Sequence, residues 1–262
     1  MNVNNNLDNL LELTPDYVEK APIFELNNFY RITQNEIKKA TEVYARAYSK
    51  ITLYEKALED TEDKSLVLKT FFEIAIRYGL KYGFPYAPSE QLEGIAIWIP
   101  YEKDKMNMWR VIRSGGFKNS IKLVKIGRDF LDSVKELSQL DKDRIKNMAG
   151  KRYLELMSLA VDPEYQRKGI ASKLLKAMFE KTDSYGYTTY VSADIDNVDF
   201  YKKHGFKVIK EINVKIKDFD LPNYEMVRNP NNTIYMDLSK SKNYYKMNSP
   251  LDNYSDLIIQ EY

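Results

Sequence analysis

The chain has 262 residues, 44% of them hydrophobic and 30% charged, with a formal net charge of +2. This composition is typical of a globular protein with one large core, and the near balance of charge argues against nucleic acid as a partner. With no cysteine and one histidine, disulfides, thiol catalysis and histidine-based metal sites are excluded, and we expect no metal. Because the chain has neither an apolar run of membrane-spanning length nor a signal peptide, we expect a cytoplasmic protein with no membrane partner.

The first part of the chain predicts a short strand followed by a helix. Residues 1–27 are rich in asparagine and lack a hydrophobic period, so we treat them as an N-terminal extension. A strand is expected at residues 29–32. Thr33 and Glu36 have the spacing of a capping box, and apolar residues at helical spacing continue to Ile51, which predicts one helix up to that point.

The middle of the chain alternates between helical and strand patterns. A second helix is expected at residues 65–79, followed by strands at 84–87 and 92–100. Residues 109–149 then read as helices with one apolar stripe beside many charged residues. A basic amphipathic helix can lie on a membrane, but we prefer the interpretation that these helices pack on their own domain. The stripe consists of Ile121, Val124, Leu131, Val134 and Leu137.

The remaining elements complete an α/β pattern. We predict one mixed central sheet flanked by helices, with a helical insertion at about residues 105–150 before the central strand. The domain is expected to span residues 28–238, and residues 239–262 form a C-terminal tail. An apolar patch at Leu257, Ile258 and Ile259 could dock on the same domain or on a partner subunit in a homodimer. Strands are expected at 153–161, 188–193, 207–214 and either 224–228 or 233–238, and helices at 169–183 and 197–204.

The segment VDPEYQRKGIASKLL, residues 161–175, is a strand, a tight turn and the start of a helix. The first N–H groups of a helix have no partner within it and lie at the positive end of its dipole, so they can bind an anion. Gly169 and Ala171 are small enough for a ligand to approach the backbone, and Arg167 and Lys168 add positive charge. The pattern therefore predicts a phosphate-binding turn.

Two motifs in this half of the chain resemble the GNAT superfamily of acetyl-coenzyme-A-dependent N-acetyltransferases. The spacing Q-x-x-G-x-A from Gln166 is similar to the pyrophosphate-binding loop of that superfamily. The segment Asn197 to Phe206 is similar to its N-x-x-F-Y-x-x-x-G-F segment. The phrases LEGIAIWIP, NVDFYKKHGF and NYEMVRNP resemble most the branch that contains puromycin N-acetyltransferase. The resemblance implies an α/β acyl-coenzyme-A N-acyltransferase fold.

The resemblance also implies a cosubstrate site for acetyl-coenzyme A. Its diphosphate would meet the backbone N–H groups of the turn, and its pantetheine arm would run beside the strand that ends near Val161. Asn197 would hydrogen-bond the pantetheine or the start of its own helix, for which capping is an equally good explanation. The residues expected to bind the cosubstrate are Leu159, Val161, Gln166, Arg167, Lys168, Gly169, Ile170, Ala171, Ser172 and Asn197.

Catalysis would require a base, an oxyanion donor and an acid. A primary amine with a pKa near 10 is almost entirely protonated at pH 7, so a base helps, and Glu155 lies where protein-modifying members of the superfamily place a glutamate. A structural glutamate is the alternative. The N–H of Leu159 or Val161 could donate to the oxyanion. Tyr201 matches the superfamily's general acid, and a core tyrosine is its alternative.

Two residues limit what the resemblance implies. Val191 stands where the puromycin-modifying branch has a glutamate pattern, so that branch's substrate chemistry does not carry over. His204 is expected to complement a helix end and is given no catalytic role.

Three hypotheses about function follow from the sequence. The first is transfer of acetyl from acetyl-coenzyme A to a primary amine of a small molecule. The second has a protein lysine or N-terminus as acceptor, and the third is a non-catalytic module that binds acyl-coenzyme A.

Overall fold

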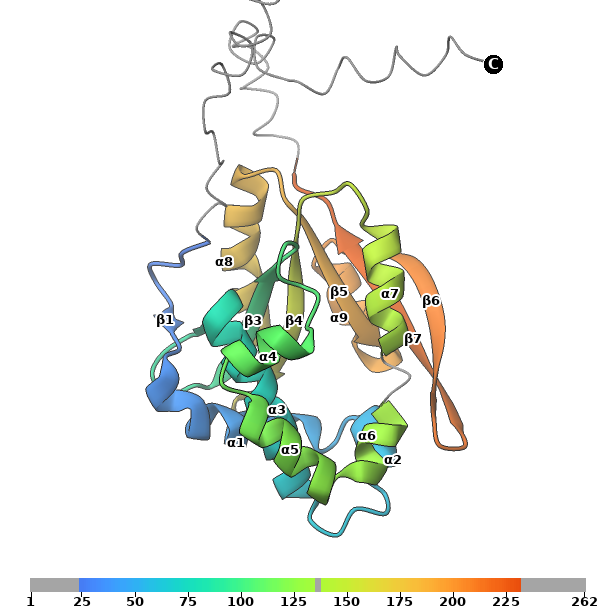
Figure 1. The fold of residues 1–262 in the computed structure, drawn as a ribbon. Coiled ribbons are helices and arrows are strands. Elements are labelled where there is room, and N and C mark those ends of the chain that lie inside the picture. Colours follow the sequence, from blue (N-terminus) through green and yellow to red (C-terminus); the bar gives the residue numbers. More distant parts are fainter. Residues whose placement is uncertain (1–23, 135–137, 232–262) are drawn as a thin grey trace, which may run out of the picture.

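The computed structural model describes residues 24–134 and 138–231, which form one seven-stranded sheet in the order β1-β2-β3-β4-β5-β7-β6 (Figure 1). Among the described strands, β4 and β5 pair in parallel, and the other neighbours are antiparallel. The prediction of a single mixed sheet is confirmed. The strands are β1 (Tyr30–Arg31), β2 (Phe84–Ala87), β3 (Gly94–Pro100), β4 (Tyr153–Val161), β5 (Thr188–Asp194), β6 (Lys207–Ile216) and β7 (Phe219–Arg228).

Helices cover the sheet, and four of them lie between β3 and β4, where the sequence predicts a helical insertion. Within the described residues, no helix is both long enough and apolar enough to cross a membrane. The helices are α1 (Ile37–Tyr48), α2 (Thr52–Ala57), α3 (Lys64–Tyr82), α4 (Met108–Arg113), α5 (Phe117–Ile126), α6 (Arg128–Val134), α7 (Ser138–Asn147), α8 (Ile170–Ser184) and α9 (Ile195–Lys203).

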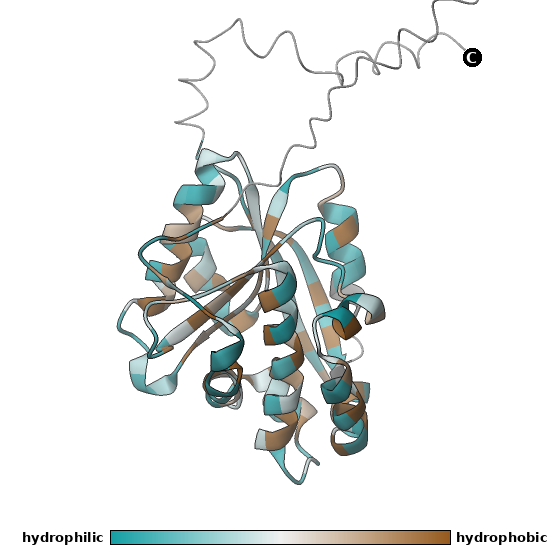
Figure 2. Cartoon of the chain, turned by 60° about the vertical axis from the view of Figure 1, so that its left-hand side comes forward, coloured by the Kyte–Doolittle hydropathy of each residue, from teal (hydrophilic) through white to brown (hydrophobic). Residues whose placement is uncertain are grey.

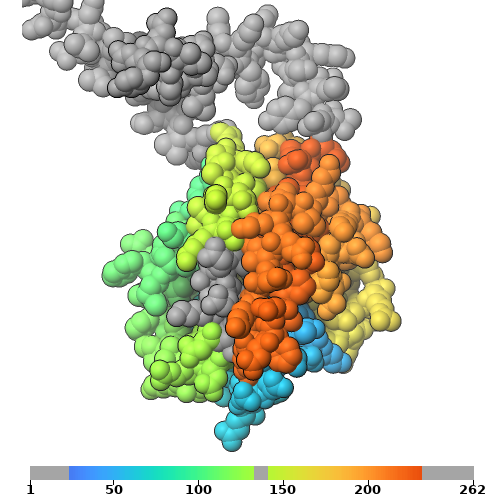
Figure 3. Space-filling view, turned by 90° about the vertical axis from the view of Figure 1, so that its right-hand side faces the viewer, coloured from blue at the N-terminus to red at the C-terminus, as the bar shows by residue number. Residues whose placement is uncertain are grey.

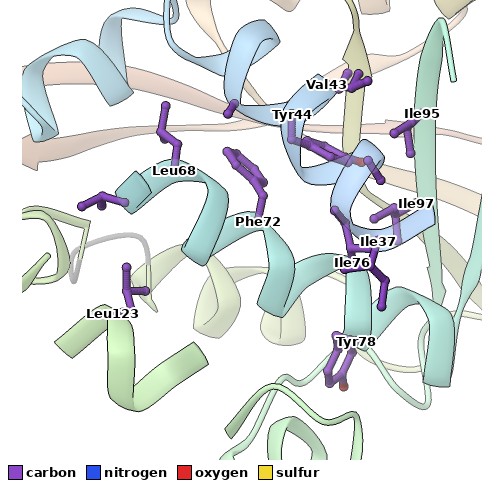
Figure 4. Packing of buried hydrophobic residues seen from close by; sticks show 14 of the residues in the cluster. Ile37, Val43, Tyr44, Leu68, Phe72, Ile76, Tyr78, Ile95, Ile97 and Leu123 are labelled. Atoms are coloured by element: carbon purple, nitrogen blue, oxygen red, sulfur yellow. The ribbon is translucent and has the colours of Figure 1, made fainter. Parts of the chain in front are cut away.

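The sheet separates two hydrophobic cores. Helices α1 and α3 pack on the face that carries Ile95 and Ile97, where the rings of Tyr44 and Phe72 stack with centroids 4.9 Å apart (Figure 4). Helices α8 and α9 pack on the opposite face, over Trp98. Successive residues of a strand face opposite sides, so the continuous apolar run of β3 supplies both cores. Figure 2 shows the hydrophobic positions concentrated along the central strands.

The capping box at the start of the first helical segment is confirmed. The Glu36 carboxylate accepts a hydrogen bond from the backbone N–H of Thr33 at 2.8 Å, and the Thr33 hydroxyl caps the turn in return. The predicted end of the helix at Ile51 is wrong, because α1 ends at Tyr48. Ile51 has extended backbone angles and is the N-cap of the separate helix α2.

The described residues reach into both ends of the predicted domain. Phe24 and Leu26, which fall in the predicted N-terminal extension, are buried against the core. The final strand at Phe219–Arg228 includes the first of the two predicted positions. The second position, 233–238, and the tail at 239–262 lie outside the described residues.

The predicted start of the second strand at Leu92 is two residues too early. Leu92 has a φ of 55°, which a strand does not accommodate, and β3 begins at Gly94. Leu92 is nevertheless fully buried. The hydrophobic pattern therefore identified a core residue but not its backbone conformation.

The apolar stripe predicted for the insertion does not pack as expected. Helix α5 faces the core through Leu123, which is buried, whereas Ile121 is 45% exposed and Val124 is 57% exposed. Leu131 is partly buried against the core. The side chains of residues 134 and 137 lie outside the described part. The expected packing is therefore wrong for Ile121 and Val124.

Helix α7 lies along the β6–β7 end of the sheet, where Figure 3 shows it beside the two strands. The Lys210 ammonium is 2.7 Å from the Asp143 carboxylate, and the Asn147 side chain donates a hydrogen bond to Glu225. These contacts hold α7 over the point where β4 leaves β5, which is where the site lies.

Candidate active site

The two central parallel strands separate and leave a cavity between them. Pairing of β4 with β5 extends from Tyr153 opposite Thr188 to Glu155 opposite Tyr190, and then stops. Both strands continue beyond this point without pairing to each other. A cavity of about 1070 Å³ occupies the gap and is lined by residues from both faces of the sheet. A ligand can therefore pass through the sheet at this place.

A β-bulge in β4 accompanies the separation. In the register with β3, Ile97 lies opposite Ser158 and Trp98 opposite Leu156, so Met157 is an extra residue on β4. A bulge bends its strand and increases its local twist. Met157 packs against the core on the α1–α3 side, where the Ser158 hydroxyl also meets Tyr44 at 2.7 Å. Two consecutive side chains therefore share one face, and the alternation of β4 is reset beyond the bulge.

The backbone of β4 beyond the bulge presents polar groups to the gap. The N–H of Asp162 donates to the carbonyl of Glu93 on the β3 side, so Leu159 and Val161 turn their backbone groups the other way. Their carbonyls accept hydrogen bonds from the Tyr48 hydroxyl and the Gln166 side chain, at 3.3 and 3.2 Å. Since β5 no longer pairs here, their N–H groups can bind a ligand.

The turn between β4 and α8 has the backbone shape of an anion-binding nest. Arg167 and Gly169 both adopt left-handed angles, with φ of 61° and 77°, and Gly169 is the N-cap of α8. A Cβ on Gly169 would meet nothing within 4 Å, so open space lies beside the backbone. The Asp162 carboxylate next to the turn pairs with the Arg46 guanidinium at 2.5 Å, which neutralises its charge. These features fit a diphosphate.

Most residues predicted to bind the cosubstrate meet in this cavity. Leu159, Val161 and Asn197 line it, as do Gln166, Arg167 and residues 169–172. Lys168 is not among the lining residues, and its ammonium lies 5.0 Å from the centre of the Tyr165 ring.

His204 connects the two helices that border the cavity. Its Nε2 lies 2.9 Å from the Ser172 hydroxyl, and its Nδ1 lies 2.8 Å from the carbonyl of Phe200. The C-terminal end of α9 is thereby tied to the first turn of α8.

Tyr201 and Asn197 both lie on α9 and face the cavity. Tyr201 is 8% exposed, and burial, with smaller effects from Tyr48 and Asp194, raises the pKa of its phenol above the ordinary value. The Asn197 amide donates to the Asp194 carboxylate at 2.9 Å, and Asp194 is the N-cap of the helix. Asn197 therefore supports the helix start, whereas the cap itself is Asp194.

Glu155 lies in a buried cluster of charges at the end of the β4–β5 ladder. One Glu155 oxygen is 2.7 Å from the Arg144 guanidinium, which also contacts Asp141 and Asp104 at 2.9 and 3.3 Å. Burial raises the pKa of Glu155 to about 8. Arg144 acts in the opposite direction, but three carboxylates share this one guanidinium and Asp104 and Asp141 add to the increase. A buried carboxyl group whose pKa is raised in this way is a candidate acid or base.

Sequence reasoning missed several residues of the site. An N-cap pattern does precede α9, so Asp194 was detectable. Arg144 and the aromatic side chains of α1 to α3 gave no signal, because only tertiary packing brings them to the gap. The far wall of the cavity is formed by Tyr48, Tyr54, Phe71, Phe72, Met106, Leu131, Asp141, Arg144 and Asn223.

A mixed sheet whose central parallel strands separate above a nest at a helix start defines the fold of acyl-coenzyme-A N-acyltransferases. Residues 139–208, which run from α7 to the start of β6, match the family model described as acetyltransferase (GNAT) domain. Among the described residues, no group of three or more His, Cys, Asp or Glu side chains is arranged to hold a metal.

One curated protein is similar over part of the chain. The uncharacterized N-acetyltransferase YafP of Escherichia coli is 33% identical over 72 residues, which are 28% of this chain and 45% of that protein. The chain therefore matches less than half the length of this relative.

Solved structures share the fold at low sequence identity. One from Corynebacterium glutamicum, described as histone acetyltransferase HPA2 and related acetyltransferase, has a TM-score of 0.52 and 18% identity over 78% of this chain and 96% of its own. A putative arylalkylamine N-acetyltransferase 7 of the yellow fever mosquito has a TM-score of 0.51 and 16% identity, over 77% and 86% of the two chains.

Replacing Gly169 by alanine tests the nest. We expect Gly169→Ala to raise the KM for acetyl-coenzyme A by about tenfold, since a left-handed conformation costs a residue with a Cβ roughly 1–2 kcal/mol and the added methyl enters the open space. The KM for the acceptor should change little. Gly150→Ala is the matched control, because Gly150 also has positive φ and open space but lies outside the cavity. Equal KM values in both variants would contradict the nest.

Proposed function

We propose that this protein transfers an acetyl group from acetyl-coenzyme A to the primary amine of a small molecule, by direct attack of the amine on the thioester. The observation that carries the proposal is the cavity between β4 and β5, which joins the nest at Gly169 to Tyr201 on one face of the sheet and Glu155 on the other. A thioester held in the gap would be reachable from both faces.

The chain's own groups divide the work between binding and proton transfer. The backbone N–H groups of residues 167–172 hold the diphosphate, and the N–H groups of Leu159 and Val161 orient the acyl arm and stabilise developing charge on its oxygen. Glu155, with its pKa near 8, accepts the proton that the amine loses. Tyr201 donates a proton to the leaving sulfur.

The far wall of the cavity favours a particular kind of amine. Tyr48, Tyr54, Phe71 and Phe72 contact one another through their rings and provide an apolar wall on the side of the sheet that carries Glu155. Asp141, half exposed, adds negative charge at the same end. These side chains suit a small amine with an apolar or aromatic body, whose ammonium is attracted by the carboxylates.

A thiol-release assay tests the function. Purified protein is mixed with acetyl-coenzyme A and a panel of arylalkyl, alkyl and polyamine acceptors, and free coenzyme A is followed with a thiol reagent. We expect release that depends on the acceptor and is greatest for amines with an apolar body. Release no greater than that of a blank without protein, for every acceptor of the panel, would refute the proposal. Tight coenzyme A binding without any turnover would instead favour the non-catalytic module.

Two finer points belong to the same proposal. Labelled-acetyl transfer to lysate proteins, read by mass spectrometry, separates a protein lysine or N-terminal acceptor from a small molecule. The comparisons with known proteins give no specific support for the puromycin N-acetyltransferase branch, and Val191 in β5 gives no reason to expect that branch's acceptor.

A further inference from the structure

Helices α4 and α5 expose large hydrophobic side chains, although the sequence pattern predicted that the insertion's apolar stripe would pack on the domain. Trp109 is 75% exposed, and Met108, Phe117, Ile121 and Val124 are exposed as well. Single exposed apolar residues are normal, but five large ones within two successive short helices are more than scattered exposure and indicate an interaction surface. We call residues 108–128 the insertion surface. The two helices lie in front of the sheet in Figure 1.

The same segment is entirely basic among its charged residues. Residues 108–128 contain six basic residues and no Asp or Glu, and the acidic Asp129 and Asp132 follow only on α6. Arg110 is held by the carbonyls of Lys105 and Glu102. The other basic residues are Arg113, Lys118, Lys122, Lys125 and Arg128.

The arrangement on α5 is that of an amphipathic helix turned outward. At 100° per residue, Phe117, Ile121 and Val124 lie within about 60° of one another on the exposed side, and the buried Leu123 lies about 100–160° away from them. Lys118, Lys122 and Lys125 border this apolar strip along one side, and the structure gives none of them a carboxylate partner among the described residues. Long lysine side chains can keep their ammonium groups among lipid headgroups while neighbouring apolar side chains enter the acyl region.

We propose that the insertion surface docks the protein on an anionic phospholipid bilayer. The charge of the surface favours a bilayer as its partner, because basic residues without acidic neighbours are attracted to the negatively charged leaflet. A second copy of the chain is disfavoured, since a two-fold contact would place the lysines of one α5 against those of the other. This inference does not depend on the proposed catalytic activity.

The docking surface adjoins the acceptor end of the candidate active site. A smaller apolar cavity between α3, α5 and α6 is lined by Ser120, Leu123 and Val124 of α5, and it shares Phe71 and Met106 with the main cavity. Docking would therefore bring the acceptor end close to the membrane surface.

The two tryptophans make the test specific. Trp98 is fully buried, so a shift in fluorescence on docking reports Trp109. The full chain is mixed with vesicles of phosphatidylcholine alone, or of phosphatidylcholine and phosphatidylserine in equal parts, and binding is measured by cosedimentation and by tryptophan emission. We expect binding and a blue shift only with the anionic vesicles, weakening as salt is added.

Charge reversal distinguishes docking through the insertion surface from a non-specific attraction between the whole protein and the anionic vesicles. The triple variant Lys118→Glu, Lys122→Glu and Lys125→Glu should lower the partition coefficient by at least about 100-fold, since each basic residue near the surface contributes about fivefold. The matched control reverses three exposed lysines elsewhere in the chain and should change it far less. Trp109→Phe should keep binding and lose the blue shift. The control substitutions are Lys176→Glu, Lys203→Glu and Lys207→Glu.

Four outcomes would overturn the proposal. The first two are no binding to anionic vesicles and an equal loss of binding in both triple variants. The third is Trp109 emission that is already blue-shifted in the free chain, which would mean that the chain's own residues cover the surface. The fourth is a concentration-dependent mass increase that the α5 variant abolishes, which would assign the surface to a second copy.

Discussion

Replacing Tyr201 by phenylalanine is expected to reduce kcat by about 10²–10⁴-fold while leaving the KM for acetyl-coenzyme A nearly unchanged, which is the range for loss of a general acid. Tyr201 lines the cavity on the α9 side, and the structure gives its hydroxyl no hydrogen-bond partner within the described part of the chain. Because burial raises its pKa, the phenol stays protonated throughout an ordinary assay range. Steady-state kinetics with thiol detection measures both constants.

The stability of this variant provides the first control. Within the described residues its hydroxyl makes no hydrogen bond that the substitution would remove, so the free energy of unfolding should change by no more than about 0.5 kcal/mol. Tyr185→Phe is the matched control for activity, since Tyr185 is exposed and lies outside the cavity. If Tyr201→Phe kept kcat within about threefold of the native value, the thiolate would leave without this proton and Tyr201 would be a packing residue.

How far the sequence predicts this molecule depends on whether the signal is local. The turn at residues 161–175 and the segment at 197–206 were recognised from local residue spacing alone, and residues of both line the cavity. The bulge at Met157 has no such signature, because it depends on the register between β3 and β4. Without it, alternation alone would assign Ser158 to the wrong face.

The charges around Glu155 show the second limit. Arg144 precedes Glu155 by eleven positions, but α7 must fold back over β4 before their side chains meet. No periodicity in the sequence specifies that packing. The exposure of the apolar stripe on α5 was missed for the same reason. An apolar stripe predicts an amphipathic helix, but it does not predict which side of the helix faces the domain. The candidate site was therefore predictable where it depends on local backbone geometry, and less so where tertiary contacts bring side chains together.

Replacing Glu155 by glutamine is expected to lower kcat by about 10²–10³-fold and to remove one limb of the pH profile. A base must be ionised to accept a proton, so in the native protein kcat should rise with pH until it flattens above the Glu155 pKa of about 8. The acceptor amine also loses its proton as pH rises, and that limb remains in both proteins. The difference between the two profiles therefore isolates Glu155. Glu93→Gln, outside the cavity, should keep the native profile.

Unfolding gives an independent check with a defined sign. The folded-state pKa of Glu155 is about 8 and the unfolded value is 4.5, so the folded chain binds its proton more tightly. That contribution to stability is fully present below pH 4.5 and is lost as pH rises through 8. Glutamine cannot ionise, and its amide oxygen can still accept a hydrogen bond from Arg144. As pH rises between these limits, the unfolding temperature of Glu155→Gln should therefore rise relative to that of the native protein. A difference in unfolding temperature that stays constant with pH would mean that Glu155 is ionised throughout. Glu155 would then be a structural partner of Arg144 and would not be the base.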